Sequence, residues 1–139
     1  MFKYIFILFI LPILMSSCSI SKLEKMGVYK ELTSIEYIVY VTDSLVNIID
    51  VRSPKEYKKS HIEGAINISY FGGSFKEELD KQKFDTTKTM LIYCETQHRS
   101  LFVANKLYKA GFKSIVDLEK GMRVWRKNNY PFIGVIPKD

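Results

Sequence analysis

Hydrophobic and polar positions alternate along the chain in blocks that predict strands followed by helices. Apolar runs over Leu45–Val51 and Met90–Tyr93 have the branched and aromatic composition of strands that are buried on both faces. Shorter runs at Gly64–Ile68 and Ser114–Leu118 predict two further strands. Strands that are covered on both faces occur in parallel sheets with helices on either side, so the pattern indicates an α/β fold.

Helix signals separate these strands. A capping box at Thr33–Glu36 opens a series of apolar positions at helical spacing up to Thr42, although the same stretch is rich in strand formers. Ser53–Glu56 provides an N-cap serine, a proline at the first helical position and a glutamate at the third. Three more helices are predicted, over Phe75–Gln82, Ser100–Ala110 and Met122–Asn128. The expected architecture has three layers, with a central parallel sheet flanked by helices.

The N-terminal stretch follows a different pattern. Lys3 precedes the apolar run Ile5–Met15, and the small polar residues Ser16 and Ser17 follow it. This order is typical of a secretory signal peptide. A membrane-spanning helix is the alternative, but it needs about 20 apolar residues and this run is shorter. The expected organisation is a signal peptide over 1–17, a flexible tether over 18–28 and a domain over 29–137.

Cys18 is a candidate lipidation site. The segment Leu14–Cys18 resembles a bacterial lipobox, with Met15 where a branched aliphatic residue is usual. This resemblance implies that the mature chain begins at Cys18 and is anchored by acyl chains to a membrane of the bacterial cell envelope, facing the periplasm or the cell surface. Cys94 would then be the only free thiol of the mature chain, without a disulfide partner in that chain.

Composition narrows the possible partners. The chain of 139 residues has 21 Lys and Arg against 15 Asp and Glu, and the basic residues are scattered. No basic block is interleaved with aromatic residues, so we expect no nucleic-acid partner. The two histidines, His61 and His98, and a single free cysteine are too dispersed for a zinc site, and no organic cofactor motif is visible. We therefore expect a monomer without metal or cofactor.

The segment from Cys94 to Ser100 joins a predicted strand to a predicted helix. A loop in this position directs its backbone N–H groups and the positive end of the helix dipole at the cysteine sulfur, which favours a thiolate and an anion beside it. Active sites in parallel α/β folds lie beyond the carboxyl ends of the strands, where Cys94 falls. Cys94 and Arg99 are therefore candidate catalytic residues. The candidate substrate-binding residues are Glu95, Thr96, Gln97, His98 and Ser100.

Three segments together resemble the rhodanese family of sulfurtransferases. Asn47–Tyr57 with His61–Ile68 is similar to the first family signature, and Tyr93–Ser100 to its active-site loop. The closing signature is matched by Ala110–Leu118, Gly121, Trp125 and Tyr130–Pro131. The resemblance implies a rhodanese-like domain and a persulfide on Cys94. The sulfur would come from thiosulfate or another sulfane-sulfur donor and pass to cyanide or a thiol.

The length of the loop separates this activity from a related one. Four residues lie between Cys94 and Arg99, whereas related phosphatases have five, which make a wider loop for a tetrahedral phosphate. The shorter loop suits a persulfide. The resemblance therefore disfavours phosphatase or arsenate reductase activity.

Two loop residues depart from the family pattern, which commonly has glycine at Gln97 and a basic or neutral residue at Glu95. Glutamine does not adopt a positive φ freely, so we expect a different loop shape. At about 6 Å, the Glu95 charge would oppose the Cys94 thiolate by about 0.7 kcal/mol when facing water and about 2.8 kcal/mol at an effective dielectric of 20. Two alternatives therefore stay open: a catalytically weak binding or regulatory module, and a thiol redox partner that forms mixed disulfides.

Asp50, Arg52 and His61 are expected to support the site structurally. Asp50 and Arg52 lie at a strand end and can pair with each other, with Arg99 or with Glu56. We interpret them as a structural ion pair. His61 lies in a predicted turn, where a side-chain hydrogen bond to the backbone is the expected role.

Overall fold

The computed structural model describes residues 19–135 of the chain. The expected signal peptide and the lipidation site Cys18 lie outside the described residues. In the part that is described, no helix is both long and apolar enough to cross a membrane. The same residues contain no group of three or more His, Cys, Asp or Glu side chains that could hold a metal ion.

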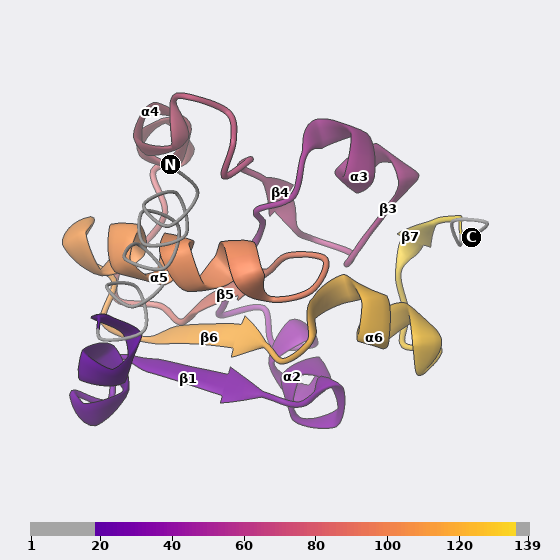
Figure 1. The fold of residues 1–139 in the computed structure, drawn as a ribbon, viewed down its shortest axis with the longest axis horizontal. Coiled ribbons are helices and arrows are strands. Elements are labelled where there is room, and N and C mark those ends of the chain that lie inside the picture. The colour runs from indigo at the N-terminus through magenta and orange to yellow at the C-terminus, as the bar shows by residue number, and fades with distance from the viewer. Residues whose placement is uncertain (1–18, 136–139) are drawn as a thin grey trace, which may run out of the picture.

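A central sheet of five parallel strands organises the fold (Figure 1). The strand order is β1-β6-β5-β2-β4, so β5 is the middle strand. The strands are β1 (Tyr29–Leu32), β2 (Asn47–Asp50), β4 (Ile66–Asn67), β5 (Met90–Tyr93) and β6 (Ile115–Leu118). Because β5 has neighbours on both edges and helices over both faces, all four of its residues are buried.

Helices cover both faces of this sheet. One face is covered by α4 (Phe75–Gln82), α5 (His98–Lys109) and the helical residues 19–25. The other face is covered by α2 (Ser34–Val41) and α6 (Gly121–Lys127). The predicted three-layer α/β architecture with a central parallel sheet is therefore confirmed.

The alternation of side chains along each strand divides the core into two clusters. Ile92 of β5 packs in the cluster on the α5 side, whereas its neighbour Leu91 packs in the cluster on the α6 side. On the α6 side, Trp125 meets Tyr37 edge-on, with ring centroids 5.9 Å apart. Complete burial of large apolar side chains such as these contributes about 1.5–3 kcal/mol each. Packing on both faces holds β5 in place. The direction in which the chain continues after Tyr93 is fixed as well.

A second, two-stranded sheet lies beside α3 (Pro54–Lys59). It pairs β3 (Ser60–His61) with β7 (Ile133–Gly134) in antiparallel fashion. Gly134 has a φ of +113°, and a Cβ atom there would overlap the Lys59 carbonyl group, so this close approach requires glycine. The pairing fixes the turn after α3, and α3 carries a side chain of the candidate site.

Most predicted elements are confirmed with small shifts at their ends. The stretch after Thr33 is helical rather than extended, and the capping box is present, with Thr33 N–H donating to Glu36. The strand expected from Leu45 begins only at Asn47, because Leu45 is 64% exposed in the preceding loop. β1 was not predicted, since its two middle residues are polar and exposed at the edge of the sheet.

Residues 19–25 differ from the flexible tether that their polar composition indicated. They are helical, and Ile20 and Leu23 are buried in the core cluster on the α5 side. Asn105 of α5 also bonds the hydroxyl of Ser19. Two apolar side chains three residues apart suffice to hold this segment on the domain, a short signal that the surrounding polar residues obscured.

Candidate active site

Cys94 directly follows β5 and opens the loop that leads into α5. Its side chain is completely buried. The hydroxyl of Ser100, in the first turn of α5, lies 3.8 Å from Cys94 Sγ. The sulfur therefore lies between the carboxyl end of the middle strand and the N-terminal end of α5.

The backbone N–H groups of the loop are free to bind an anion. In the described chain, the N–H groups of residues 95–100 donate to no backbone carbonyl. Residues 98–100 form the first turn of α5, where N–H groups have no partner inside the helix and carry the positive end of its dipole. A negatively charged sulfur at Cys94 would be stabilised by these groups.

Gln97 adopts the backbone conformation for which glycine is typical. Its φ is +77°, in the left-handed region, which costs a residue with a side chain about 1–2 kcal/mol. Its side-chain Oε1 accepts a hydrogen bond from the Lys120 N–H at 3.2 Å, which offsets part of this cost. The loop thus keeps a positive φ at this position, contrary to the expectation of a different shape.

The start of α6 holds the carbonyl groups of the loop. The N–H of Met122 donates to the Cys94 carbonyl at 2.8 Å, and the N–H of Arg123 donates to the Glu95 carbonyl at 3.1 Å. Gly121 has a φ of +65°, and a Cβ atom there would lie 2.5 Å from the Cys94 carbonyl oxygen. Glycine is therefore required for this approach, which engages the loop carbonyls and leaves the loop N–H groups for the sulfur.

Arg99 links the loop to α3. Its Nη1 and Nη2 donate to the two carboxylate oxygens of Glu56, at 2.8 and 2.7 Å. These hydrogen bonds lower the pKa of Glu56 to about 2 and raise the pKa of Arg99, to which the nearby Cys94 also contributes. The same carboxylate caps α3 through Ser53. Arg99 is thereby held beside Cys94 as a fixed positive charge.

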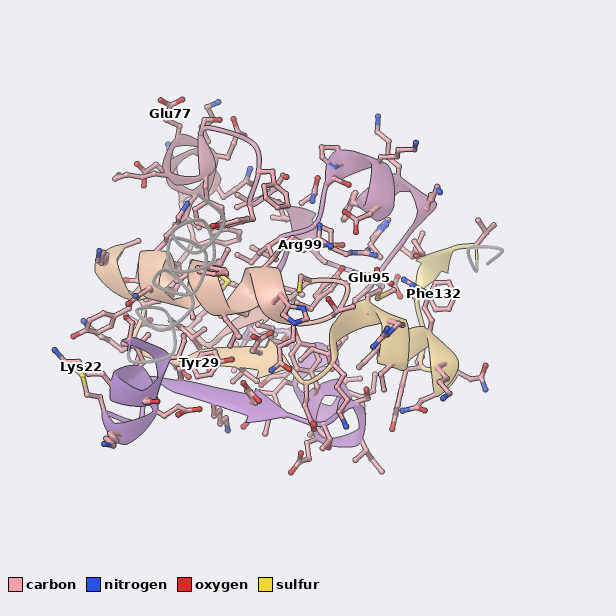
Figure 2. The ribbon with its side chains drawn as sticks, in the orientation of Figure 1. Lys22, Tyr29, Glu77, Glu95, Arg99 and Phe132 are labelled. Atoms are coloured by element: carbon pink, nitrogen blue, oxygen red, sulfur yellow. The ribbon has the colours of Figure 1, made fainter. Side chains whose placement is uncertain are left out.

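Glu95 is paired with two arginines. Its carboxylate accepts a hydrogen bond from Arg52 at 2.9 Å and forms an ion pair with Arg126. Figure 2 shows Glu95 toward α6 and Arg99 on the other side of the loop, toward α3. The two positive charges compensate the repulsion that we expected between Glu95 and the Cys94 thiolate.

Arg52 connects Glu95 to the interior. Its Nη2 lies 2.6 Å from Asp50 Oδ2, its Nε donates to both Asp50 oxygens, and both side chains are buried. Its guanidinium carbon also lies 5.6 Å from the centre of the Tyr93 ring. Of the pairings that the sequence allowed, Asp50 therefore binds Arg52, and Arg99 binds Glu56. This geometry agrees with a structural role for the Asp50–Arg52 pair.

The two histidines have separate surroundings. His61 Nδ1 donates to the Tyr57 carbonyl at 2.9 Å, and its ring stacks on that of Tyr57 with centroids 3.9 Å apart. His98 is exposed, and its Nδ1 lies 3.0 Å from the Thr96 hydroxyl. His61 thus makes the backbone hydrogen bond that we expected, while His98 and Thr96 brace the outer side of the loop.

Three residues of the site were not recognised in the sequence. Glu56 was interpreted as a helix cap, and Arg126 only as one of the scattered basic residues, because nothing in their spacing reveals their partners. Asp117 of β6 is completely buried and accepts a hydrogen bond from the Tyr29 hydroxyl at 2.9 Å, and burial raises its pKa well above the usual range. The signal for Asp117 was an acidic residue inside the otherwise apolar run Ile115–Leu118.

Comparison with known proteins gives a consistent result. The family model of the rhodanese-like domain matches residues 36–128. Thiosulfate sulfurtransferase GlpE of Coxiella burnetii is 30% identical over 101 residues, which cover 73% of this chain and 91% of that protein. The chloroplastic thiosulfate sulfurtransferase 16 of Arabidopsis thaliana is 32% identical over 92 residues, which cover 60% and 76% of the two chains. YrkF of Bacillus subtilis, whose name describes a sulfur carrier, is 34% identical over 86 residues. This match covers 60% of this chain but only 43% of that protein.

Solved structures show the same fold. A rhodanese-related protein from Thermoplasma volcanium superposes with a TM-score of 0.65 at 24% identity, covering 76% of this chain and 98% of that one. The polysulfide-sulfur transferase homodimer of Wolinella succinogenes also has a TM-score of 0.65 at 24% identity, covering 83% and 86%. The matched segment includes β5, the Cys94 loop and α5, and the chain belongs to the rhodanese-like domain family of proteins.

Proposed function

We propose that the protein is a sulfurtransferase that carries sulfane sulfur as a persulfide on Cys94. The observation that supports it is the loop between β5 and α5, whose unpaired N–H groups and helix N-terminus surround the Cys94 sulfur. Arg99 adds a fixed positive charge beside Cys94. Relatives that are named thiosulfate sulfurtransferases, at about 30% identity, support the same class of reaction.

The proposed reaction has two steps that balance in atoms and charge. In the first, the Cys94 thiolate attacks the outer sulfur of thiosulfate, the S–S bond of the donor breaks, and sulfite leaves with the bonding pair. In the second, cyanide or a thiolate attacks the outer sulfur of the persulfide, and the Cys94 thiolate is regenerated. The negative charge stays on the terminal sulfur between the steps, where the loop N–H groups stabilise it.

The position of Cys94 favours a small donor. Its side chain has no exposed surface, so a donor must bring its reacting sulfur into the loop itself. An anionic donor is suited to this loop because the carboxylates of Glu95 and Glu56 are both paired with arginines. Residues 95–98 and Ser100 would form the walls of the binding site.

Intact mass spectrometry tests the persulfide. The full chain carrying Cys18→Ser, in detergent, keeps Cys94 as its single cysteine and would be incubated first with thiosulfate and then with polysulfide. We expect a mass increase of one sulfur atom that disappears on addition of cyanide. The same chain carrying Cys94→Ser is the control and should gain nothing. If neither donor adds sulfur to Cys94, the carrier function is wrong.

A catalytically weak binding or regulatory module is the second candidate. Complete burial of Cys94 is the observation that favours it, because a buried thiol reacts only when a ligand can enter the loop. A folded chain that binds thiosulfate in calorimetry but forms no sulfur adduct would support this candidate. A disulfide-linked partner released by reductant would instead indicate a thiol redox role.

We also propose that the protein is lipid-anchored in the cell envelope through Cys18. The apolar run that ends at Ser16-Ser17-Cys18 supports this proposal. The helical residues 19–25 pack on the core, so acyl chains on Cys18 would hold the domain close to the membrane surface. Replacing Cys18 with alanine should release the protein from membranes after salt washing. Unchanged membrane binding of this variant would contradict the anchor.

A further inference from the structure

Aromatic and basic side chains share the outer side of α5. Phe102, Asn105, Lys106 and Lys109 are spaced so that the last three follow the first by three, four and seven residues, which places all four on one side of the helix. Phe102, Lys106 and Lys109 are exposed. The other side of α5 packs into the core. The side that carries these four residues therefore faces away from the sheet.

Two rings from the loop before α4 extend this side of the helix. The Tyr70 ring stacks on that of Phe102, with centroids 5.8 Å apart, and its centroid lies 5.1 Å from that of Phe71. Phe71 is 72% exposed, the largest fraction for a large apolar side chain in the described part of the protein. We call Tyr70, Phe71, Phe102, Lys106 and Lys109 the aromatic–lysine surface. Contiguous exposed apolar groups of this kind mark a surface that interacts with another body.

The positive charge of this surface is only partly balanced by the protein. Lys106 Nζ lies 5.0 Å from the centre of the Tyr70 ring and 5.2 Å from that of Phe75. Neither Lys106 nor Lys109 forms an ion pair with a residue in the range 19–135. Both also line a groove of about 450 Å³ between α5 and the start of α4, where Glu77 is the single acidic residue of the described lining (Figure 1).

The chain enters the domain on the same side of α5. Asn105 bonds the hydroxyl of Ser19, the first described residue. Cys18 is one residue away, and consecutive Cα atoms are about 3.8 Å apart. If the N-terminal stretch is retained, its apolar run ends at Met15, and four residues of extended chain span at most about 14 Å. In either case, a membrane that holds the N-terminal segment lies beside this side of α5.

We propose that the aromatic–lysine surface docks on a bilayer that contains anionic phospholipids. The inference rests on the proposal that the N-terminal segment brings the chain to a membrane. Exposed aromatic rings suit the boundary between headgroups and acyl chains, and lysines beside them bind the phosphate groups of anionic lipids. Because Arg99 precedes Phe102 by about one helical turn, docking would place the Cys94 loop at the edge of the contact, next to the membrane.

A fluorophore on a single cysteine identifies the docked face. The protein is the full chain carrying Cys18→Ser and Cys94→Ser, in vesicles of phosphatidylglycerol and phosphatidylcholine whose acyl chains carry bromine as quencher. Ala110→Cys places the fluorophore at the exposed end of the groove, and Val39→Cys places it on α2, which covers the opposite face of the sheet. We expect quenching at position 110 to be at least about twofold stronger than at position 39. Equal quenching at the two positions, or stronger quenching on α2, overturns the inference.

The lysines should make docking depend on anionic lipid. Quenching at position 110 should fall by at least about half in pure phosphatidylcholine, or when salt is raised from about 0.1 M to about 1 M. Lys106→Glu combined with Lys109→Glu should have the same effect. Lys58→Glu with Lys59→Glu on α3 is the matched control, because these exposed lysines give the same change in net charge away from the surface. An equal fall with both pairs would reduce the effect to total charge and contradict the inference.

Phe71→Ser tests the aromatic contribution. Its matched control is Ile35→Ser on α2, where the side chain is 69% exposed, so neither change opens the core. Quenching at position 110 should fall with Phe71→Ser and stay unchanged with Ile35→Ser, with near-ultraviolet circular dichroism verifying the fold. No fall with Phe71→Ser contradicts the docking surface. A dimer in detergent that Phe71→Ser dissociates would assign the surface to a second copy of the chain, which also contradicts it.

These outcomes are separate from those that test the proposed function. The labelled chain has neither an acyl group nor Cys94, so its docking depends on neither lipidation nor sulfur transfer. If the quenching pattern holds but Cys18→Ala leaves membrane binding unchanged, only the lipid anchor is contradicted. If Cys18→Ala releases the protein but the fluorophores at positions 110 and 39 are quenched equally, only the docking surface is contradicted.

Discussion

Two carboxyl groups close to Cys94 have different surroundings. Glu95 is 25% exposed and is paired with Arg52 and Arg126. Asp117 is completely buried, has no cationic partner in the described residues, and has a pKa raised by burial. The difference teaches that a carboxyl group close to the sulfur can be balanced by a counter-charge where water reaches it, whereas burial without a cation raises its pKa.

Arg52 pairs with both Asp50 and Glu95, so replacing it should have the largest effect. Arg52→Met would leave Asp50 buried without a cation and Glu95 with only Arg126. We expect a loss of about 3–5 kcal/mol in the free energy of unfolding, measured by urea denaturation. Adding Asp50→Asn should recover part of this loss. A loss below about 1 kcal/mol would mean that the buried pair does not stabilise this side of the loop.

Replacing the buried acid Asp117 should increase the free energy of unfolding, whereas replacing Arg52 decreases it. A group whose pKa is raised in the folded state makes stability fall as pH rises above the unfolded-state pKa, because the folded protein holds a proton that the unfolded chain releases. Asp117→Asn should therefore gain stability relative to the unmodified chain by about 1.4 kcal/mol for each pH unit in that window. Urea denaturation at several pH values from acid to neutral measures the gain. A gain that does not depend on pH would contradict a protonated Asp117.

Replacing Glu95 should change the stability less than replacing Arg52 or Asp117. Glu95→Gln removes the partner of Arg126, while Arg52 keeps Asp50, so we expect a loss of about 1 kcal/mol in stability. The pH midpoint of thiolate formation at Cys94, measured from the ultraviolet absorbance of the thiolate, should move by less than about 0.3 units, because the charge that is removed is already compensated. A fall of a full unit would show that the arginines do not screen Glu95 from the sulfur.

The smallest effect is expected at the partly exposed pair of Arg99 and Glu56. Arg99 lowers the pKa of Glu56 to about 2, so the pair stabilises the protein above the unfolded-state pKa of glutamate, about 4.3, and this contribution is lost as pH falls toward about 2. Glu56→Gln should cost at most about 1 kcal/mol near neutral pH and nothing at the acid limit. Thermal unfolding at both pH values measures the difference. An equal cost at the two pH values would indicate loss of the α3 cap alone.

The architecture could be predicted because it depends on patterns that are local in the sequence. The buried run of β5, the capping boxes before α2 and α3, and the position of Cys94 at a strand end were all recognisable. The helix over residues 19–25 and the edge strand β1 could not be recognised in the same way, because the helix has two buried apolar side chains among polar ones and β1 has one, Tyr29. Packing against α5 and β6 fixes them.

The electrostatics of the site could be predicted only in part. That Asp50 and Arg52 would pair was an open possibility from their spacing, but the partners of Glu95 and Arg99 come from segments 31 and 43 residues away. Gln97 was expected to change the loop, yet the N–H of Lys120 supports its positive φ. Contacts of this kind depend on which helix ends meet at the loop, and a linear pattern does not contain that information.

The sequence by itself determined that a cysteine ends a buried strand, that a loop with four residues between Cys94 and Arg99 follows it, and that the fold is a three-layer α/β domain. These features follow from residue spacing and hydrophobic periodicity, which act over a few residues. The tertiary structure alone decided how the charges around the sulfur are balanced. The physical reason is that the pairing of Glu95 and the raised pKa of Asp117 depend on burial and on neighbours brought together by folding.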